Sequence, residues 1–152
     1  MICLIQISQK LLTKQENNNI INIGYILYNE VNKRLENFNI DFFELENGDC
    51  PIKDYLDSVD KKLRAKILWT IGLLETNGNM LGMPYSEHLD DGIFELRTKQ
   101  GSDISRVLYF FCIGRKIILT HGFTKKTNKV PKSEIEIAKK YRDIYVSRQK
   151  GE

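Results

Sequence analysis

The sequence predicts an α+β domain in which a small antiparallel sheet carries two helices on its N-terminal side and one C-terminal helix. Three strand-like apolar segments follow one another between residues 93 and 124, separated by short turn signals. Apolar residues recur at helical spacing between residues 52 and 74, and again between 135 and 145. The order of strand, two helices, antiparallel meander and helix is typical of helices packed on one face of a sheet. We therefore expect the other face to be free.

The chain of 152 residues, 41% of them hydrophobic, is long enough for one ordinary domain with a real core. Residues 1–37 differ in composition, since eight asparagines fall between positions 15 and 40. Within that stretch Leu27, Val31, Leu35 and Phe38 are spaced as in a short amphipathic helix. We interpret residues 1–37 as an extension whose order the sequence leaves open, and residues 38–150 as the folded domain.

Positive charge is concentrated at the C-terminal end. The whole chain has a net charge of only +3, but from His121 onward nine Lys and Arg face four acidic residues, a net of +5. A basic end on a nearly neutral body is typical of a surface that meets a polyanion. A solvated helix face has the same composition, and both interpretations stay open.

The cysteines and the N-terminal residues indicate the cellular compartment in which the protein is expected. Cys3, Cys50 and Cys112 are an odd number without metal-binding spacing, which is typical of reduced thiols in a cytoplasmic protein. The first residues lack the basic segment of a signal peptide, and no apolar run approaches the roughly 20 residues that cross a bilayer. We expect a cytoplasmic protein without a membrane partner, a metal or another cofactor.

The first half of the domain begins with a strand. The segment NIDFFEL, residues 39–45, is apolar and precedes the turn signal Asn47-Gly48. Pro51 suits the first turn of a short helix. Ser58 or Asp60 is expected to cap a longer helix that ends at Gly78.

The second half is predicted to be a loop, a three-stranded meander and a helix. Residues 80–91 have the composition of a loop. The strands IFELRTK, RVLYFFCI and KIILTHGF then follow, and the second of them is apolar on both faces, as in a central strand. Pro131 opens the last helix, in which Ser133 and Glu136 have the spacing of a capping box.

The polar residues near this sheet are cations, imidazoles and a phenol, without a carboxylate pair, a nucleophilic triad or a glycine-rich phosphate loop. RNA is cleaved when its 2′-hydroxyl attacks the adjacent phosphorus, provided that protons move and the developing negative charge is stabilised. Imidazole and phenol can carry protons, and guanidinium and ammonium groups can hold the phosphate. The candidates are Arg97, Tyr109, His121 and Arg106 for catalysis, and Lys125, Lys126, His88 and Lys99 for binding phosphate.

Each candidate also has a structural interpretation. His121 could bond a loop, Tyr109 could belong to the core, and Arg97 could pair with Glu95. Strict alternation places Arg106 on the face opposite Tyr109, so the two share a site only if a bulge intervenes. His88 could simply fix the loop that contains it.

Three motifs of the chain resemble a known family. PYSEHLDDGIFELR (84–97), RVLYFF (106–111) and IILTHGFTKKTNKVPKSEIEIAKK (117–140) are similar to the RelE/HigB-like toxins of bacterial type II toxin–antitoxin systems, in particular the phage-associated branch. The resemblance covers about residues 38–148 and does not extend to the N-terminal segment. It implies a RelE-like α+β fold.

The resemblance also implies an activity and partners. Such toxins are ribosome-dependent mRNA endonucleases that inhibit translation, and a small helix-turn-helix antitoxin neutralises them. The family's site would fall on Arg97, Arg106, Tyr109, His121, Lys125 and Lys126, whereas Glu87 stands where relatives often have a basic residue. ParE-like members of the superfamily share the fold but inhibit DNA gyrase without catalysis, which is the alternative function.

Overall fold

The computed structural model describes residues 23–28, 31, 37–127 and 129–151. The chain divides into two units, Met1–Glu36 and Asn37–Glu152. In the first unit the described residues, 23–28 and 31, are helical with exposed side chains. Leu27 and Val31 of the expected amphipathic helix are among them, whereas Leu35 lies outside the described residues.

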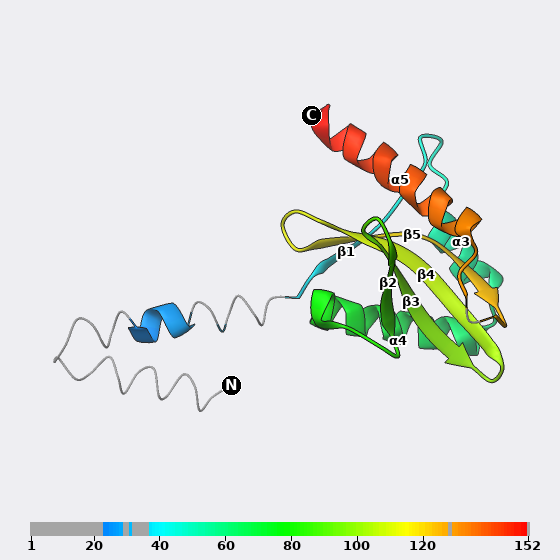
Figure 1. Cartoon of the computed structure of the whole chain (residues 1–152), viewed down its shortest axis with the longest axis horizontal. Helices are drawn as coiled ribbons and strands as arrows, with labels where there is room; N and C mark the ends of the chain where they lie inside the picture. The colour runs from blue at the N-terminus through cyan, green and yellow to red at the C-terminus, as the bar shows by residue number, and fades with distance from the viewer. Residues whose placement is uncertain (1–22, 29–30, 32–36, 128, 152) are drawn as a thin grey trace. The chain divides into compact units, whose positions relative to one another are not determined.

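The second unit is an α+β domain, which confirms the predicted class (Figure 1). Its sheet has the strand order β1-β5-β4-β3-β2. β1 pairs with β5 in parallel and the other pairs are antiparallel, so the sheet is mixed. The elements are β1 (Asn39–Phe42), α3 (Pro51–Ser58), α4 (Lys61–Asn77), the 3₁₀ turn η1 (Gly78–Met80), β2 (Ser86–Asp90), β3 (Ile93–Gln100), β4 (Asp103–Cys112), β5 (Lys116–Lys125) and α5 (Lys132–Lys150).

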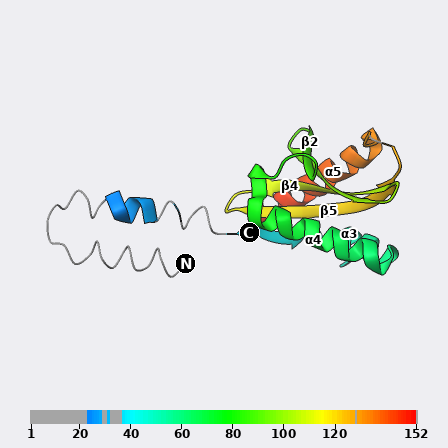
Figure 2. The same cartoon turned by 90° about the horizontal axis from the view of Figure 1, so that it is seen from below.

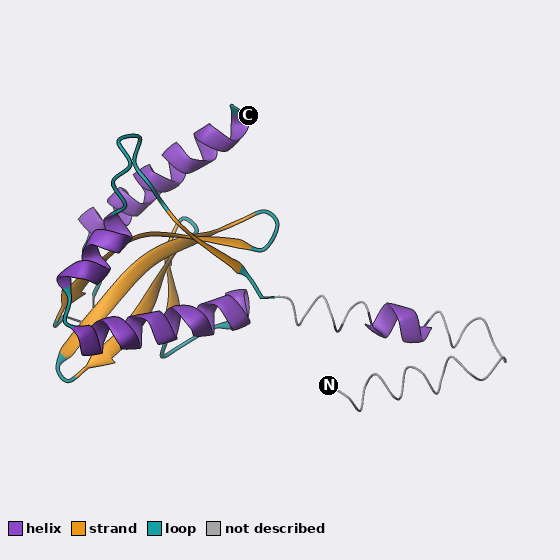
Figure 3. Ribbon diagram, turned by 180° about the vertical axis from the view of Figure 1, so that it is seen from behind, coloured by secondary structure: helices purple, strands orange, loops and turns teal. Residues whose placement is uncertain are grey.

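Helices cover both faces of the sheet, so the expectation of one free face is wrong. α3 and α4 lie on one side and α5 on the other (Figures 2 and 3). The reason is the central strand β4, which is apolar on both faces: Val107 packs toward α3 and α4, whereas Leu108 and Phe110 pack toward α5. Burying both apolar faces requires a layer of helix on each side.

The expected ends of α4 are confirmed. Asp60 is its N-cap, and the carboxylate accepts hydrogen bonds from the backbone N–H groups of Lys62 and Leu63 at 2.9 and 3.0 Å. Gly78 ends the helix with a φ of 51°, a conformation that costs glycine little. The prediction of a capping box at the start of α5 is wrong. Pro131 is the N-cap, and Ser133 already lies in the first turn without a capping hydrogen bond.

Part of the predicted loop at residues 80–91 is the edge strand β2. Its sequence, SEHLD, contains a single apolar residue, Leu89, and no β-branched residue. An edge strand bonds to one neighbour only and needs little apolar surface, so its composition resembles that of a loop.

A β-bulge in β5 determines which side chains reach the α5 side of the sheet. Leu108 pairs with His121 but Tyr109 pairs with Leu119, which leaves Thr120 as the extra residue. Ahead of the bulge, Leu119 packs toward α3 and α4; beyond it, Phe123 packs toward α5. The bulge reverses the alternation of the strand and so turns His121 to the α5 side.

Within the described part of the chain, none of the helices is both long enough and apolar enough to cross a membrane.

Candidate nucleic-acid interface

Cationic residues of three strands share the α5 side of the sheet. Arg97 pairs with Arg106, which pairs with Phe123 on β5, and Lys99 and Lys125 both pair with Ile104. His121 lies two residues before Phe123 on β5, opposite Leu108. Because paired residues of neighbouring strands point to the same face, these side chains form one surface. We call it the cationic face, and its members are Arg97, Lys99, Arg106, His121 and Lys125.

Arg106 is the fully buried member of the cationic face. Its side chain is fully buried, and one terminal nitrogen forms an ion pair with Glu95, whose side chain is also buried. The other terminal nitrogen donates to the Thr127 carbonyl at 2.7 Å, which ties β4 to the segment between β5 and α5. A buried charge is tolerated only with such partners, so Arg106 organises the site from below and does not reach solvent.

Arg97 lies at the rim, between an inner and an outer carboxylate. Its Nε is 3.6 Å from Glu95 Oε1, and one terminal nitrogen is 3.7 Å from Glu87 Oε2. The side chain is 18% exposed, whereas that of Glu87 is 51% exposed. Both separations are longer than a hydrogen bond, and an ion pair with an exposed carboxylate is weak. The outer side of this guanidinium is therefore accessible to a stronger anion.

His121 lies beside the first turn of α5. Its Nε2 is 2.9 Å from Glu134 Oε2, and its Nδ1 is 3.1 Å from Thr120 Oγ1. The Thr120 hydroxyl donates to the Leu108 carbonyl at 2.9 Å, and its role toward Nδ1 depends on which ring nitrogen of His121 carries the proton. Burial lowers the pKa of His121 from its usual 6.5, and Glu134 opposes that shift. Both ring nitrogens are thus occupied inside the protein.

Tyr109 does not lie on the cationic face. It is 1% exposed and packs with the core on the α3 and α4 side, where its hydroxyl is 2.6 Å from Ser86 Oγ. Burial raises the pKa of Tyr109 to about 12. The expectation that Arg97, Tyr109 and His121 share one surface is therefore wrong for Tyr109. Arg106, which alternation places on the face opposite Tyr109, lies on the same side of the sheet as Arg97 and His121.

The remaining candidates divide between the two sides. Lys99 and Lys125 are exposed on the cationic face, and Lys126 is exposed immediately beyond the end of β5. His88 is on β2 and not in a loop, and its ring meets Phe94 edge-on at 5.0 Å, on the α3 and α4 side. Its Nε2 accepts a hydrogen bond from the Gly92 N–H at 3.3 Å. His88 is thus separate from the cationic face.

The acidic residues of the site were not predicted as site residues. Glu95 joins Arg97 to Arg106, and Glu134 holds His121. Alternation in IFELRTK places Glu95 on the face of Arg97, which is a signal that the sequence did carry. Glu134 had no such signal, because its partner is 13 positions away on a different element.

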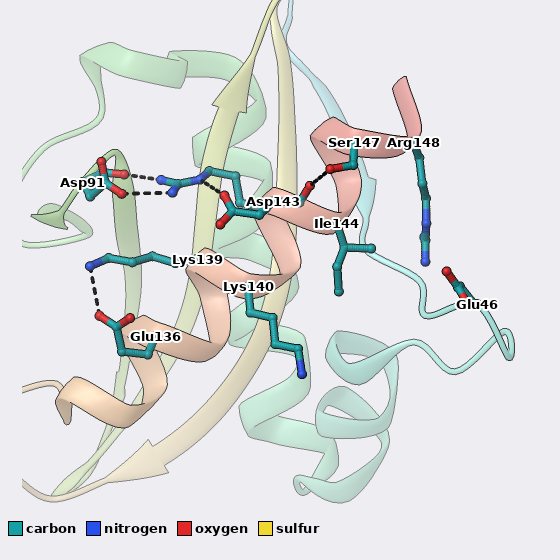
Figure 4. A pocket seen from close by; sticks show the side chains of 10 residues that line it. Glu46, Asp91, Glu136, Lys139, Lys140, Asp143, Ile144, Ser147 and Arg148 are labelled. Carbon is teal, nitrogen blue, oxygen red and sulfur yellow. Dashed lines mark hydrogen bonds and ion pairs between the residues drawn. The ribbon is translucent and has the colours of Figure 1, made fainter. Parts of the chain in front are cut away.

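A shallow hollow of about 730 Å³ lies along the outer side of α5, away from the cationic face. Two pairs of its charged groups are in contact: Arg142 with Asp91 at 2.9 Å, and Lys139 with Glu136 at 2.9 Å (Figure 4). Lys139 also reaches Asp90 at 2.6 Å, and these carboxylates raise its pKa. The Lys139–Asp90 and Arg142–Asp91 pairs hold α5 to the β2–β3 turn. The charges of the hollow therefore serve the packing of these elements.

The donor set of the site suits a phosphate and does not suit a cation. Among the described residues no group of three or more His, Cys, Asp and Glu side chains is placed to hold a metal ion. The rim instead presents guanidinium and ammonium groups, which bind phosphoryl oxygens.

Comparison with known proteins assigns the family. The model of the family described as Phage derived protein Gp49-like (DUF891) matches residues 54–143, which include α4, the whole β2–β5 meander and most of α5. No curated protein matches the chain. The Gp49-like family is part of the RelE/toxin-like group and is compatible with the toxin of a toxin–antitoxin system. The chain belongs to the Gp49-like family of phage-derived proteins.

Proposed function

We propose that the chain is the toxin of a type II toxin–antitoxin system, of the RelE/HigB kind, and that it cleaves mRNA on the ribosome. The observation that carries this proposal is the cationic face, where Arg97, Lys99 and Lys125 stand exposed or half-exposed above a buried Glu95–Arg106 pair. A row of cations fixed on a rigid sheet supports the binding of a ribonucleotide backbone. The Gp49-like family is consistent with this function.

The proposed reaction is a transesterification. The 2′-oxygen attacks the adjacent phosphorus, the bond to the 5′-oxygen breaks, and the products are a 2′,3′-cyclic phosphate and a 5′-hydroxyl end. The phosphate displaces the exposed Glu87 from Arg97, and the guanidinium then stabilises the negative charge of the transition state. Lys99 and Lys125 hold the flanking phosphates.

In this proposal the His121–Glu134 pair takes the proton of the attacking 2′-hydroxyl and gives a proton to the leaving 5′-oxygen, so the pair ends the step in its starting protonation state. The pair lies two strand spacings from Glu95, roughly 10 Å at about 4.8 Å for each spacing. Glu134 is 23% exposed, so it connects the buried imidazole to the surface. Tyr109 is a poor proton carrier here because it is buried on the opposite side and its pKa is raised to about 12.

The partners in this proposal are the ribosome, mRNA and a helix-turn-helix antitoxin, all in the cytoplasm. Expression of the chain without an antitoxin is expected to stop growth and to leave messages cut within translated regions. Primer extension on mRNA from induced cells detects such ends. Growth arrest with DNA damage and intact mRNA would instead support the ParE-like inhibition of gyrase.

Variants test the proposed site directly. Arg97→Ala is expected to abolish cleavage, because it removes the partly exposed guanidinium at the rim, whereas Tyr109→Phe is expected to retain it. Lys53→Ala, which removes an exposed cation from α3 on the other side of the sheet, is the matched control for lost charge. Circular dichroism checks that each variant is folded. Full toxicity in folded Arg97→Ala would contradict the site proposed here.

A further inference from the structure

Near the rim of the cationic face, helix α4 and the segment that leads into β2 carry exposed apolar groups that the proposed function does not use. Trp69 on α4 is 57% exposed and Met83 is 62% exposed. The Trp69 ring meets that of Tyr85 edge-on, with centroids 5.9 Å apart and an interplanar angle of 71°. We call Trp69, Met83 and Tyr85 the aromatic edge. A tryptophan normally buries most of its large apolar surface, so this exposure requires an explanation.

The aromatic edge adjoins the rim cation of the proposed site. A terminal nitrogen of Arg97 is 3.9 Å from the Met83 sulfur, and the Arg97 backbone N–H donates to the Tyr85 carbonyl at 2.7 Å. The same segment therefore contacts Trp69 on one side and Arg97 on the other. Trp69 is the exposed ring of this group and Tyr85 is half-buried beside it. An exposed aromatic ring next to a phosphate-binding cation is an arrangement with which proteins hold single-stranded nucleic acids.

The indole of Trp69 also has room beside it. Gly72 lies three positions further along α4, and three positions apart are neighbours on a helix surface. A Cβ built at Gly72 would meet nothing within 4 Å. The helix surface at Gly72 is thus uncovered, which leaves space near Trp69 for a flat group such as a nucleobase.

We propose that Trp69, supported by Tyr85 and Met83, stacks an unpaired base of the RNA whose phosphate is held by Arg97. This inference rests on the proposed function and adds to it the contact with the base. It commits to single-stranded RNA as the occupant, because the charged group that contacts the aromatic edge is Arg97, whose guanidinium suits a phosphate. Since every base has a flat face, the platform holds RNA without selecting a sequence.

The test uses the full chain at low salt and two short RNA oligomers. One is a 2′-O-methyl adenosine oligomer, which has no free 2′-hydroxyl to react, and the other is its abasic counterpart with the same charge. Trp69 is the only tryptophan in the sequence, so its fluorescence reports on this position alone. The base-bearing oligomer is expected to bind about ten- to a hundredfold more tightly than the abasic one and to quench the emission.

Variants separate the base contact from the phosphate contact, with affinity measured by the anisotropy of labelled oligomers. Trp69→Ala is expected to reduce the affinity for the base-bearing oligomer to that for the abasic one, and Trp69→Phe to retain part of the difference. Leu68→Ala, which removes a neighbouring apolar side chain of 49% exposure, is the matched control and should change neither. Arg97→Ala should weaken the binding of both oligomers alike.

Three outcomes would overturn the inference. Equal affinities for the two oligomers with unchanged fluorescence would remove the stacking platform and leave the proposed nuclease intact. Loss of antitoxin neutralisation in Trp69→Ala with unchanged RNA affinity would make the aromatic edge a protein contact. Failure of both oligomers to bind would contradict the phosphate-binding surface, and with it the proposed function itself.

Discussion

Arg106 and Glu95 carry opposite charges into the layer between the sheet and α5. Neither side chain has more than 2% of its surface exposed, and among the described residues the Arg106 Nε has no hydrogen-bond partner. Because the pair is buried away from solvent, the loss of one partner leaves the other as an uncompensated charge. Replacement of Arg106 therefore tests the fold before it tests any chemistry.

Arg106→Met is expected to lower the free energy of unfolding by about 3–5 kcal/mol, because Glu95 would remain buried without its partner. The double variant Arg106→Met with Glu95→Gln is expected to recover much of that loss, since no buried charge remains. Urea denaturation of both single variants and the double variant measures the coupling. Independent, additive effects would show that the pair is not the buried unit described above.

His121 makes stability depend on pH. Burial lowers its pKa in the folded chain below the usual 6.5, so between the two values the unfolded chain binds more protons. The free energy of unfolding therefore falls as the pH drops below about 6.5, and it is insensitive to this group at higher pH. His121→Gln should remove that part of the slope between about pH 7.5 and about pH 5.5 in urea denaturation. His88→Gln, at an exposed histidine, is the control and should retain it.

Among the elements, β5 and α3 approach each other closely at Gly122. A Cβ at this position would collide with the ring of Tyr55. That ring cannot move aside freely, because the Tyr55 hydroxyl is 2.7 Å from both Ser105 Oγ and Thr124 Oγ1. The contact holds α3 against the strand immediately after the bulge that turns His121.

Gly122→Ala is expected to lower the free energy of unfolding by about 1–3 kcal/mol, the usual cost of overpacking. Gly82→Ala is the matched control: nothing lies within 4 Å of an added Cβ there, so stability should hold or rise slightly. Urea denaturation compares the two variants with the natural chain. A stable Gly122→Ala variant would mean that α3 can shift from its position against β5.

The elements differed in how well their sequences predicted them. α4 followed from its apolar spacing, its Asp60 cap and its terminal glycine, all of which are local signals. β2 was missed because an edge strand needs little apolar surface. The position of His121 was not predictable, because the bulge at Thr120 arises from pairing with β4 and has no local signal. Simple alternation would have placed His121 on the same side as Tyr109.

At the scale of the whole molecule, the packing that positions the site lies within the second unit. The two core clusters on either side of the sheet draw their residues from positions 38–145. The family match at residues 54–143 falls in the same region. We therefore propose residues 38–150 as the toxin domain and residues 1–37 as an extension, and a fragment can test this division.

A fragment of residues 37–152 is expected to fold cooperatively and to unfold at a urea concentration close to that of the full chain, because it keeps both clusters. Urea denaturation and the growth assay on the two chains together check stability and toxicity. A fragment that folds normally but has lost toxicity would assign a working role to the first unit. A fragment that fails to fold would show that the domain begins before residue 37.

The order in which the ribosome makes this chain has a consequence for a protein proposed to attack ribosomes. β1 pairs with β5, whose residues come more than 70 positions later, and His121 finds Glu134 only on the final helix. A nascent chain that stops short of α5 therefore lacks Glu134 beside His121, and it lacks the helix that packs on the Leu108 and Phe110 side of the sheet. If the proposed function holds, the His121–Glu134 pair that carries protons is complete only after α5 has been made, so the chain is inactive while it is being translated and an antitoxin can be made in the same interval.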